Sequence, residues 1–192
     1  MVSCLAEEPE PTMREALLFL VRSLSDLYIL AFVLRFVFQL VRMDYHNPLA
    51  QAVVQITNPL VVPARRLLPS SRRIDLPTLV VIVALECVST ALLFVIQSYT
   101  PTAQQFVVTV LLRLAGLTIW FYIVSLLVYV ASSWFVGGGY HPMLRALGEI
   151  VAPLLRPVRR VLPPVSGLDL APMLVTILLI ALWIALNGAL AR

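Results

Sequence analysis

Several ionisable residues lie inside long apolar runs of this sequence, where a charge is costly unless it is paired or used. Arg35 lies near the end of the first run, Glu86 inside the second and Arg113 inside the third. Ionisable groups within a bilayer usually face the protein interior, where they pair with one another or line a path for ions or protons. Both a structural ion pair and an ion pathway are therefore candidate chemistries. Arg22 and Asp26, also in the first run, have the i,i+4 spacing that lets them pair on one helix.

Helix geometry indicates which of these charges meet. Glu86 follows Asp75 by eleven residues, a rise of about 16 Å from that end of its helix. Arg113 lies about 18 Å from the same side of a bilayer core that is about 30 Å thick, and Arg35 lies only about 10 Å in. We therefore predict that Glu86 pairs with Arg113, with Arg35 as the second choice.

A second set of candidates combines prolines with paired arginines between the apolar runs. The pattern P-x-x-x-P-x-R-R-x-x-P occurs twice, and an aspartate follows each copy. Prolines at this spacing predict a stiff, extended chain in place of a regular helix. The residues are Pro59, Pro63, Arg65, Arg66, Pro69 and Asp75 in the first copy, and Pro153, Pro157, Arg159, Arg160, Pro163 and Asp169 in the second.

Basic segments of this kind can bind lipid headgroups, a protein partner or nucleic acid. Arginines at the membrane surface bind lipid phosphates, and they also form docking surfaces for a protein partner. We expect no specific nucleic-acid binding, because no reading helix or series of stacking aromatic residues accompanies the charges. Asp75 and Asp169 are expected to cap the helices that follow them, to pair with the neighbouring arginines, or to do both.

The remaining polar residues form no pattern of a known catalytic or cofactor site. There is no Ser/His/Asp set, no HExxH and no phosphate-binding glycine loop. Cys4 and Cys87 have neither zinc-ligand nor haem-attachment spacing, and His46 and His141 are expected at the membrane boundary. We therefore expect no enzyme activity, no cofactor and no metal.

The elements that must position these residues are four apolar runs, at residues 16–41, 76–96, 106–134 and 171–190. The chain is 60% hydrophobic, against about 45–50% apolar residues in a soluble domain. Each run reaches the roughly 20 residues that cross a bilayer. A spanning segment must satisfy its own backbone hydrogen bonds, so all four runs should be helices. The predicted fold class is all-α, a polytopic membrane protein with four transmembrane helices.

The connecting segments reveal an internal repeat. Residues 48–76 match residues 142–170 without a gap, and the identities are dominated by prolines and arginines. After Pro48 and Pro142, apolar residues recur at helical spacing, which predicts a short amphipathic helix in the membrane interface. The repeat unit is span, basic segment, span, in two parallel copies. We expect a disordered tail over 1–13 and repeats over 14–97 and 98–192.

The arginines also predict the orientation. Both basic connectors fall on one side of a four-span chain, while the connector 97–105 carries no charge. Cytoplasmic loops are enriched in basic residues. We therefore expect the Arg-rich connectors in the cytoplasm and both termini in the periplasm or exterior, in a bacterial inner membrane.

The repeated motif resembles that of the YggT family of small bacterial membrane proteins, called YlmG in some lineages. The first copy reads Asn47-Pro48, Thr57-x-Pro59, Pro63-x-Arg65-Arg66-x-x-Pro69 and Asp75; the second reads His141-Pro142, Pro153, Pro157-x-Arg159-Arg160-x-x-Pro163 and Gly167-Leu168-Asp169. Family repeats also tend to carry an arginine near the end of the first helix. Arg35 fits this position in the first copy, whereas Tyr129 replaces it in the second.

The resemblance implies an integral membrane protein without established catalytic activity. Members are linked to osmotic-stress tolerance and potassium balance, to cell or plastid division, and to cytochrome b6 assembly in chloroplasts. One hypothesis is a scaffold or assembly factor that presents the two Pro-Arg segments to a membrane-protein partner or a second copy, within membrane lipids. The alternative is a small-ion conductor or regulator with Glu86, Arg113 and Arg35 at its centre. Four helices enclose little space, so a pore would need oligomers.

Overall fold

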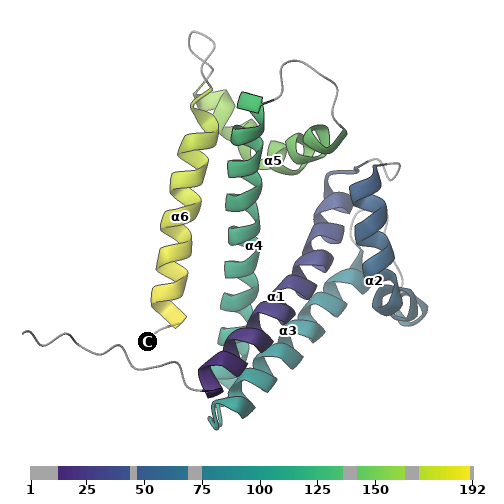
Figure 1. Ribbon diagram of the computed structural model, residues 1–192, viewed down its shortest axis with the longest axis vertical. Helices are drawn as coiled ribbons and strands as arrows, with labels where there is room; N and C mark the ends of the chain where they lie inside the picture. The colour runs from purple at the N-terminus through teal and green to yellow at the C-terminus, as the bar shows by residue number, and fades with distance from the viewer. Residues whose placement is uncertain (1–12, 44–46, 69–74, 136–141, 163–168, 191–192) are drawn as a thin grey trace, which may run out of the picture.

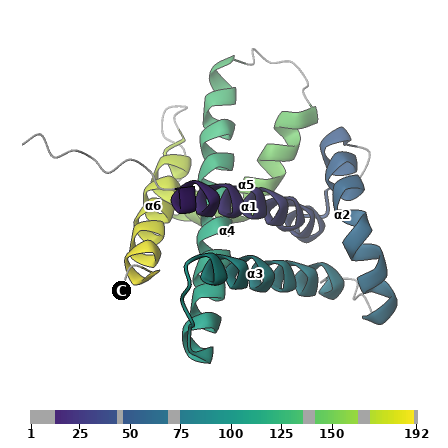
Figure 2. The same ribbon diagram turned by 60° about the horizontal axis from the view of Figure 1, so that its bottom comes forward.

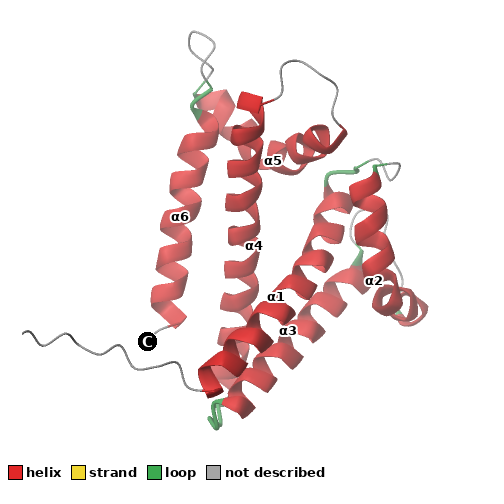
Figure 3. Cartoon of the chain, in the orientation of Figure 1, coloured by secondary structure: helices red, strands yellow, loops and turns green. Residues whose placement is uncertain are grey.

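The computed structural model describes residues 13–43, 47–68, 75–135, 142–162 and 169–190. These residues form the helices α1 (Met13–Leu40), α2 (Pro48–Leu67), α3 (Leu76–Ile96), α4 (Ala103–Phe135), α5 (Pro142–Val161) and α6 (Ala171–Leu190). Figure 3 shows helices, a few short loops and no strand among the described residues. Helices α1, α3, α4 and α6 are long and apolar enough to cross a membrane. The predicted fold class, all-α with four spans, is confirmed.

The spans lie close to their predicted limits. Helices α3 and α6 have the expected bounds, and α1 begins at Met13, the last residue of the predicted tail; residues 1–12 lie outside the described chain. Helix α4 begins three residues earlier than its apolar run because Thr102 and Gln105 form a capping box. The Gln105 N–H donates to Thr102 Oγ1 at 3.3 Å and the Thr102 N–H donates to Gln105 Oε1 at 2.9 Å.

Each repeat is a unit of three helices. Helix α1 packs against α3 and α2, and in the same way α4 packs against α6 and α5; the two units meet where α4 contacts α1 and α3. In Figure 1, α2 and α5 lie toward the end where α1 and α4 finish, while the last residues of α3 and α6 lie at the opposite end. The repeats are therefore parallel, and both basic connectors lie at one end of the molecule.

Helices α2 and α5 are the predicted amphipathic helices, but the prediction that the proline segments are extended is wrong. Helix α2 continues through Pro59 and Pro63, and α5 continues through Pro153 and Pro157. Figure 2 shows α2 as two helical segments that meet at an angle. A proline bends a helix because it lacks an N–H and its ring displaces the carbonyl four residues before it.

The bends are tolerated because the prolines lie on the exposed face. All four prolines are exposed, whereas Val53, Thr57 and Val61 are buried along the opposite side of α2. The bends therefore fall on the exposed side, and the packed face keeps its contacts. The outer prolines of the motif, Pro69 and Pro163, lie outside the described residues.

Candidate functional site

A network of buried charges joins the two repeats. Arg113 of α4 donates from Nε to Glu86 Oε1 of α3 at 2.6 Å and from Nη2 to Asp26 Oδ1 of α1 at 2.9 Å. The side chain of Arg113 is 9% exposed and that of Glu86 only 1%. The predicted pair of Glu86 and Arg113 is therefore present. The sequence predicted only Arg22 as a partner of Asp26. The i,i+4 spacing within one helix can be read from the sequence, whereas the contact of Asp26 with another helix cannot.

Arg22 and Thr90 lie at the edge of this network, and one carboxylate oxygen of Glu86 lacks a partner. Arg22 Nε lies 3.8 Å from Asp26 Oδ2, a longer contact than the one between Asp26 and Arg113. The Thr90 hydroxyl donates to Glu86 Oε1 at 3.3 Å, while Glu86 Oε2 is buried without a hydrogen-bond partner in the described structure. Two arginines and two carboxylates thus balance in charge, and the network ties α1, α3 and α4 together.

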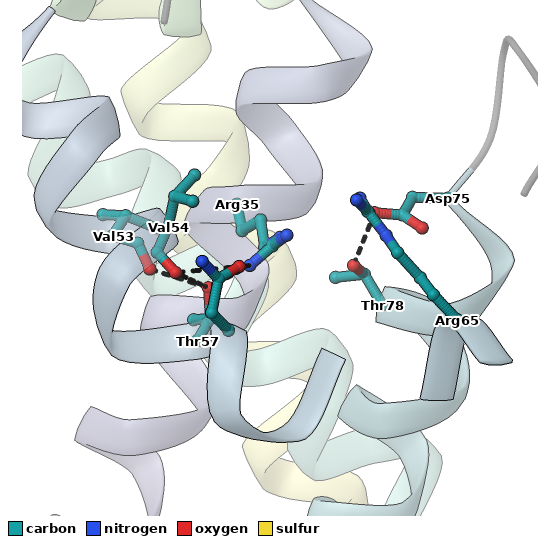
Figure 4. A network of polar contacts seen from close by, with 8 residues as sticks. Arg35, Val53, Val54, Thr57, Arg65, Asp75 and Thr78 are labelled. Atoms are coloured by element: carbon teal, nitrogen blue, oxygen red, sulfur yellow. Dashed lines mark hydrogen bonds and ion pairs between the residues drawn. The ribbon is translucent and has the colours of Figure 1, made fainter. Parts of the chain in front are cut away.

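Arg35 serves a different contact from the one considered for it. Its side chain is buried, and Nη1 donates to Thr57 Oγ1 at 2.6 Å and to Asn58 Oδ1 at 2.9 Å, both in α2. The Thr57 hydroxyl in turn donates to the Val53 carbonyl at 2.7 Å (Figure 4). Glu86 has Arg113 instead, so the second-choice pairing is wrong. Arg35 fixes α2 to α1 just before the proline bends.

The two basic segments each contain one ion pair at the same place in the repeat, here called the Arg–Asp latches. Arg65 Nη2 lies 2.8 Å from Asp75 Oδ2, and Arg159 donates from Nη2 and Nε to Asp169 Oδ2 at 2.6 and 2.9 Å. Each latch joins the end of an amphipathic helix to the start of the next span. The pairing alternative predicted for both aspartates is confirmed.

The predicted helix caps hold for only one aspartate. Asp169 Oδ1 accepts the Ala171 N–H at 3.1 Å, whereas the Asp75 side chain caps no backbone N–H of α3. The counterpart of Ala171 is Pro77, which has no N–H to offer. The Thr78 hydroxyl replaces it and donates to Asp75 Oδ2 at 2.7 Å (Figure 4).

The remaining arginines of the motif point outward. Arg66 and Arg160, which directly follow the latch arginines, are exposed, and the described structure gives neither of them a partner carboxylate. Among the described residues, no group of three or more His, Cys, Asp or Glu is placed to hold a metal ion. The chemistry that this arrangement offers is therefore charge pairing and presentation of cationic side chains.

Comparison with known proteins identifies the repeat. A model of the CCB3/YggT family matches residues 14–96 and again residues 108–190, which fall on the two three-helix units. The chain belongs to the CCB3/YggT family. YggT of Escherichia coli K12 is 35% identical over 85% of each chain, and an uncharacterized protein of Pseudomonas aeruginosa is 33% identical over 82% of this chain and 81% of that protein. No solved structure matches this chain.

The second repeat of this CCB3/YggT chain lacks the Arg35 contact, and the residues on both sides of that contact differ together. Tyr129 stands 94 residues after Arg35, and the counterparts of the acceptors Thr57 and Asn58 are Val151 and Ala152. Gly148 stands opposite the new ring: a Cβ there would lie 3.6 Å from Tyr129 Cε2. The arginine and its acceptors have thus been exchanged together for an aromatic ring and an apolar wall.

Tyr129 also reaches the second latch. Burial lowers the pKa of Arg159, but hydrogen bonds to Tyr129 and Asp169, together with the charge of Asp169, outweigh this effect, so the pKa is raised above its ordinary value. The second latch therefore connects α4, α5 and the start of α6 through one guanidinium that stays charged.

The buried charge network has no charged counterpart in the second repeat of this YggT-type chain. Asp26, Glu86 and Ser89 correspond to Trp120, Ile180 and Trp183, and the two tryptophan rings lie 5.7 Å apart. This buried network is thus specific to the junction between the repeats, unlike the Arg–Asp latches, which occur once in each repeat.

Proposed function

We propose that this chain is a non-catalytic scaffold or assembly factor of the bacterial inner membrane, which presents α2 and α5 on the cytoplasmic side. One observation carries the proposal. Two equivalent Arg–Asp latches, at 2.8 and 2.6 Å, anchor the ends of α2 and α5 to the spans that follow them, at the same end of the molecule. A duplicated, anchored surface is suited to holding a partner in a fixed orientation.

The exposed side chains of these helices suggest the chemistry of the partner. Arg66 of α2 and Arg156 and Arg160 of α5 are exposed, and α2 also exposes the apolar side chains of Ile56 and Leu60, which are 53% and 37% exposed. A surface of this kind fits a membrane protein or a second copy that offers carboxylates near the headgroup level. The excess of arginine at this end supports a cytoplasmic orientation, with the termini in the periplasm.

The latch residues and their exposed neighbours make a matched test. Arg66→Gln with Arg160→Gln should abolish the function while membrane insertion and thermal stability remain, because both arginines are exposed and have no partner carboxylate among the described residues. Arg65→Gln should instead lower stability. The assay compares growth under osmotic stress and septum formation in a deletion strain that expresses each variant at equal level. Full function with Arg66→Gln and Arg160→Gln would rule out the scaffold surface.

The second candidate is a small-ion conductor or regulator of potassium balance. It is favoured by a single observation, the unpaired carboxylate oxygen of Glu86 within a span. If the chain conducts ions, liposomes that contain the purified protein should show a potassium or proton flux, and Glu86→Gln should change that flux. The pairing of the Glu86 carboxylate with Arg113 favours the scaffold, since a paired and balanced network has no free charge to attract an ion.

A further inference from the structure

An apolar groove lies between the two repeats. Figure 1 shows α1 and α4 crossing and then separating toward the end where α2 and α5 lie. The cavity measures about 260 Å³. Its lining includes Phe36 and Leu40 of α1, Leu79 and Ile82 of α3, and Leu114 and Tyr122 of α4.

The groove suits hydrocarbon better than water. Thr118 also lines it, but its hydroxyl already donates to the Leu114 carbonyl at 2.8 Å. An apolar cavity of about 150 Å³ stays dry and accepts benzene, whereas a bound water needs two to four polar partners. An unfilled groove would also lose dispersion contacts along its walls. Inside a bilayer, the hydrocarbon at hand is a lipid acyl chain.

The groove reaches the membrane surface beside an exposed arginine. Leu40 is the last residue of α1, and Leu79 lies in the first turns of α3, so both mark the end of the groove near the headgroups. Arg42 follows Leu40 by two residues and is exposed, in a turn where its φ is 56°. A lipid whose chain lies in the groove therefore places its headgroup near Arg42.

The charges at this end select an anionic headgroup. Each described carboxylate there is paired with an arginine: Asp75 with Arg65 at 2.8 Å, Glu149 with Arg145 at 3.1 Å and Asp169 with Arg159 at 2.6 Å. The surplus consists of exposed arginines without a partner carboxylate in the described part of the chain: Arg42, Arg66, Arg156 and Arg160.

We propose that the groove binds one acyl chain of an anionic phospholipid, with the lipid phosphate at Arg42. This lipid fills the space between the diverging repeats and holds them at their angle. The proposal is independent of the scaffold, since it concerns a face of the spans and not the partner surface.

The test measures the lipid that the intact protein retains. Purified protein is exchanged into detergent with equal phosphatidylglycerol and phosphatidylethanolamine, and bound lipids are counted by native mass spectrometry. We expect one phosphatidylglycerol per chain. Leu79→Trp, which fills the groove from a residue 37% exposed, should remove it. Arg42→Gln should weaken its retention about fivefold, as expected for one arginine at an anionic surface.

The repeat supplies matched controls. Met173 stands 94 residues after Leu79 and is 60% exposed outside the groove, so Met173→Trp should retain the lipid. Arg160→Gln removes a charge at the end of α5, beside α6, and should also retain it. Equal retention of the two phospholipids, loss with the controls, or displacement by soluble glycerol phosphate would overturn the proposal.

A second measurement needs no variant. A phosphatidylglycerol with a photoreactive group in its acyl chain should crosslink the native protein at Phe36, Leu40 or Tyr122. Adducts spread evenly over lipid-facing residues such as Ile184 would show ordinary annular lipid and contradict the groove.

Discussion

Removing Arg113 alone should destabilise the protein far more than removing both partners of its buried pair. After Arg113→Met, the Glu86 carboxylate, only 1% exposed, keeps one hydrogen bond, from Thr90 at 3.3 Å. Leaving a buried charge without its partner costs about 3–5 kcal/mol, whereas replacing both partners by apolar residues is often neutral. The chain itself provides the apolar alternative, because the counterpart of Glu86 in the second repeat is Ile180.

We therefore expect Arg113→Met to lower the free energy of unfolding by about 3–5 kcal/mol, and Arg113→Met with Glu86→Ile to recover most of that loss. Unfolding would be followed by circular dichroism during titration of detergent micelles with dodecyl sulfate. Arg22→Met is the matched control: its side chain is 59% exposed and 3.8 Å from Asp26, so it should cost at most about 1 kcal/mol. A double variant no more stable than Arg113→Met would refute the reasoning.

Two further predictions concern the contacts of α2 and α5. Thr57→Val removes the acceptor that lies 2.6 Å from Arg35, and it should lower stability by about 1–3 kcal/mol in the same titration, because the buried guanidinium loses a bond. Tyr129→Phe should cost less than about 1 kcal/mol, because it removes a polar contact to Arg159, whose side chain is 36% exposed to solvent screening. Since the folded pKa of Arg159 is raised above its ordinary value, its contribution is fully present at every pH below the ordinary pKa of arginine; equal losses at about pH 6 and about pH 9 are expected, and a loss confined to one pH would contradict this.

The architecture followed from the sequence where a single physical rule dominated. Length and apolar composition determined the spans, and helical rise placed Glu86 and Arg113 at one depth, so their pairing was predictable without tertiary information. The duplicated prolines and arginines likewise predicted two parallel units. These inferences depend only on the positions of residues along each helix, and those positions can be counted in the sequence.

The errors arose where a neighbouring helix decides the outcome. The proline segments remain helical because the face opposite the prolines is packed, and that face is visible only when α1 and α3 are in place. The same limit hid Asp26 as a partner of Arg113 and Thr57 as a partner of Arg35. At Asp75, Pro77 already removed one of the two N–H groups that a cap can use, and the Thr78 hydroxyl, which donates to Asp75 Oδ2, takes the place of a backbone cap.

The placement of both amphipathic helices on one side of the membrane is the claim on which the account depends. Cysteine labelling tests it directly: Arg66→Cys and Arg160→Cys are introduced singly into a chain in which Cys4 and Cys87 have been replaced by serine. A membrane-impermeant maleimide should modify both positions in inverted inner-membrane vesicles and neither in intact spheroplasts. Labelling of one position in spheroplasts and the other in inverted vesicles would contradict the parallel repeat.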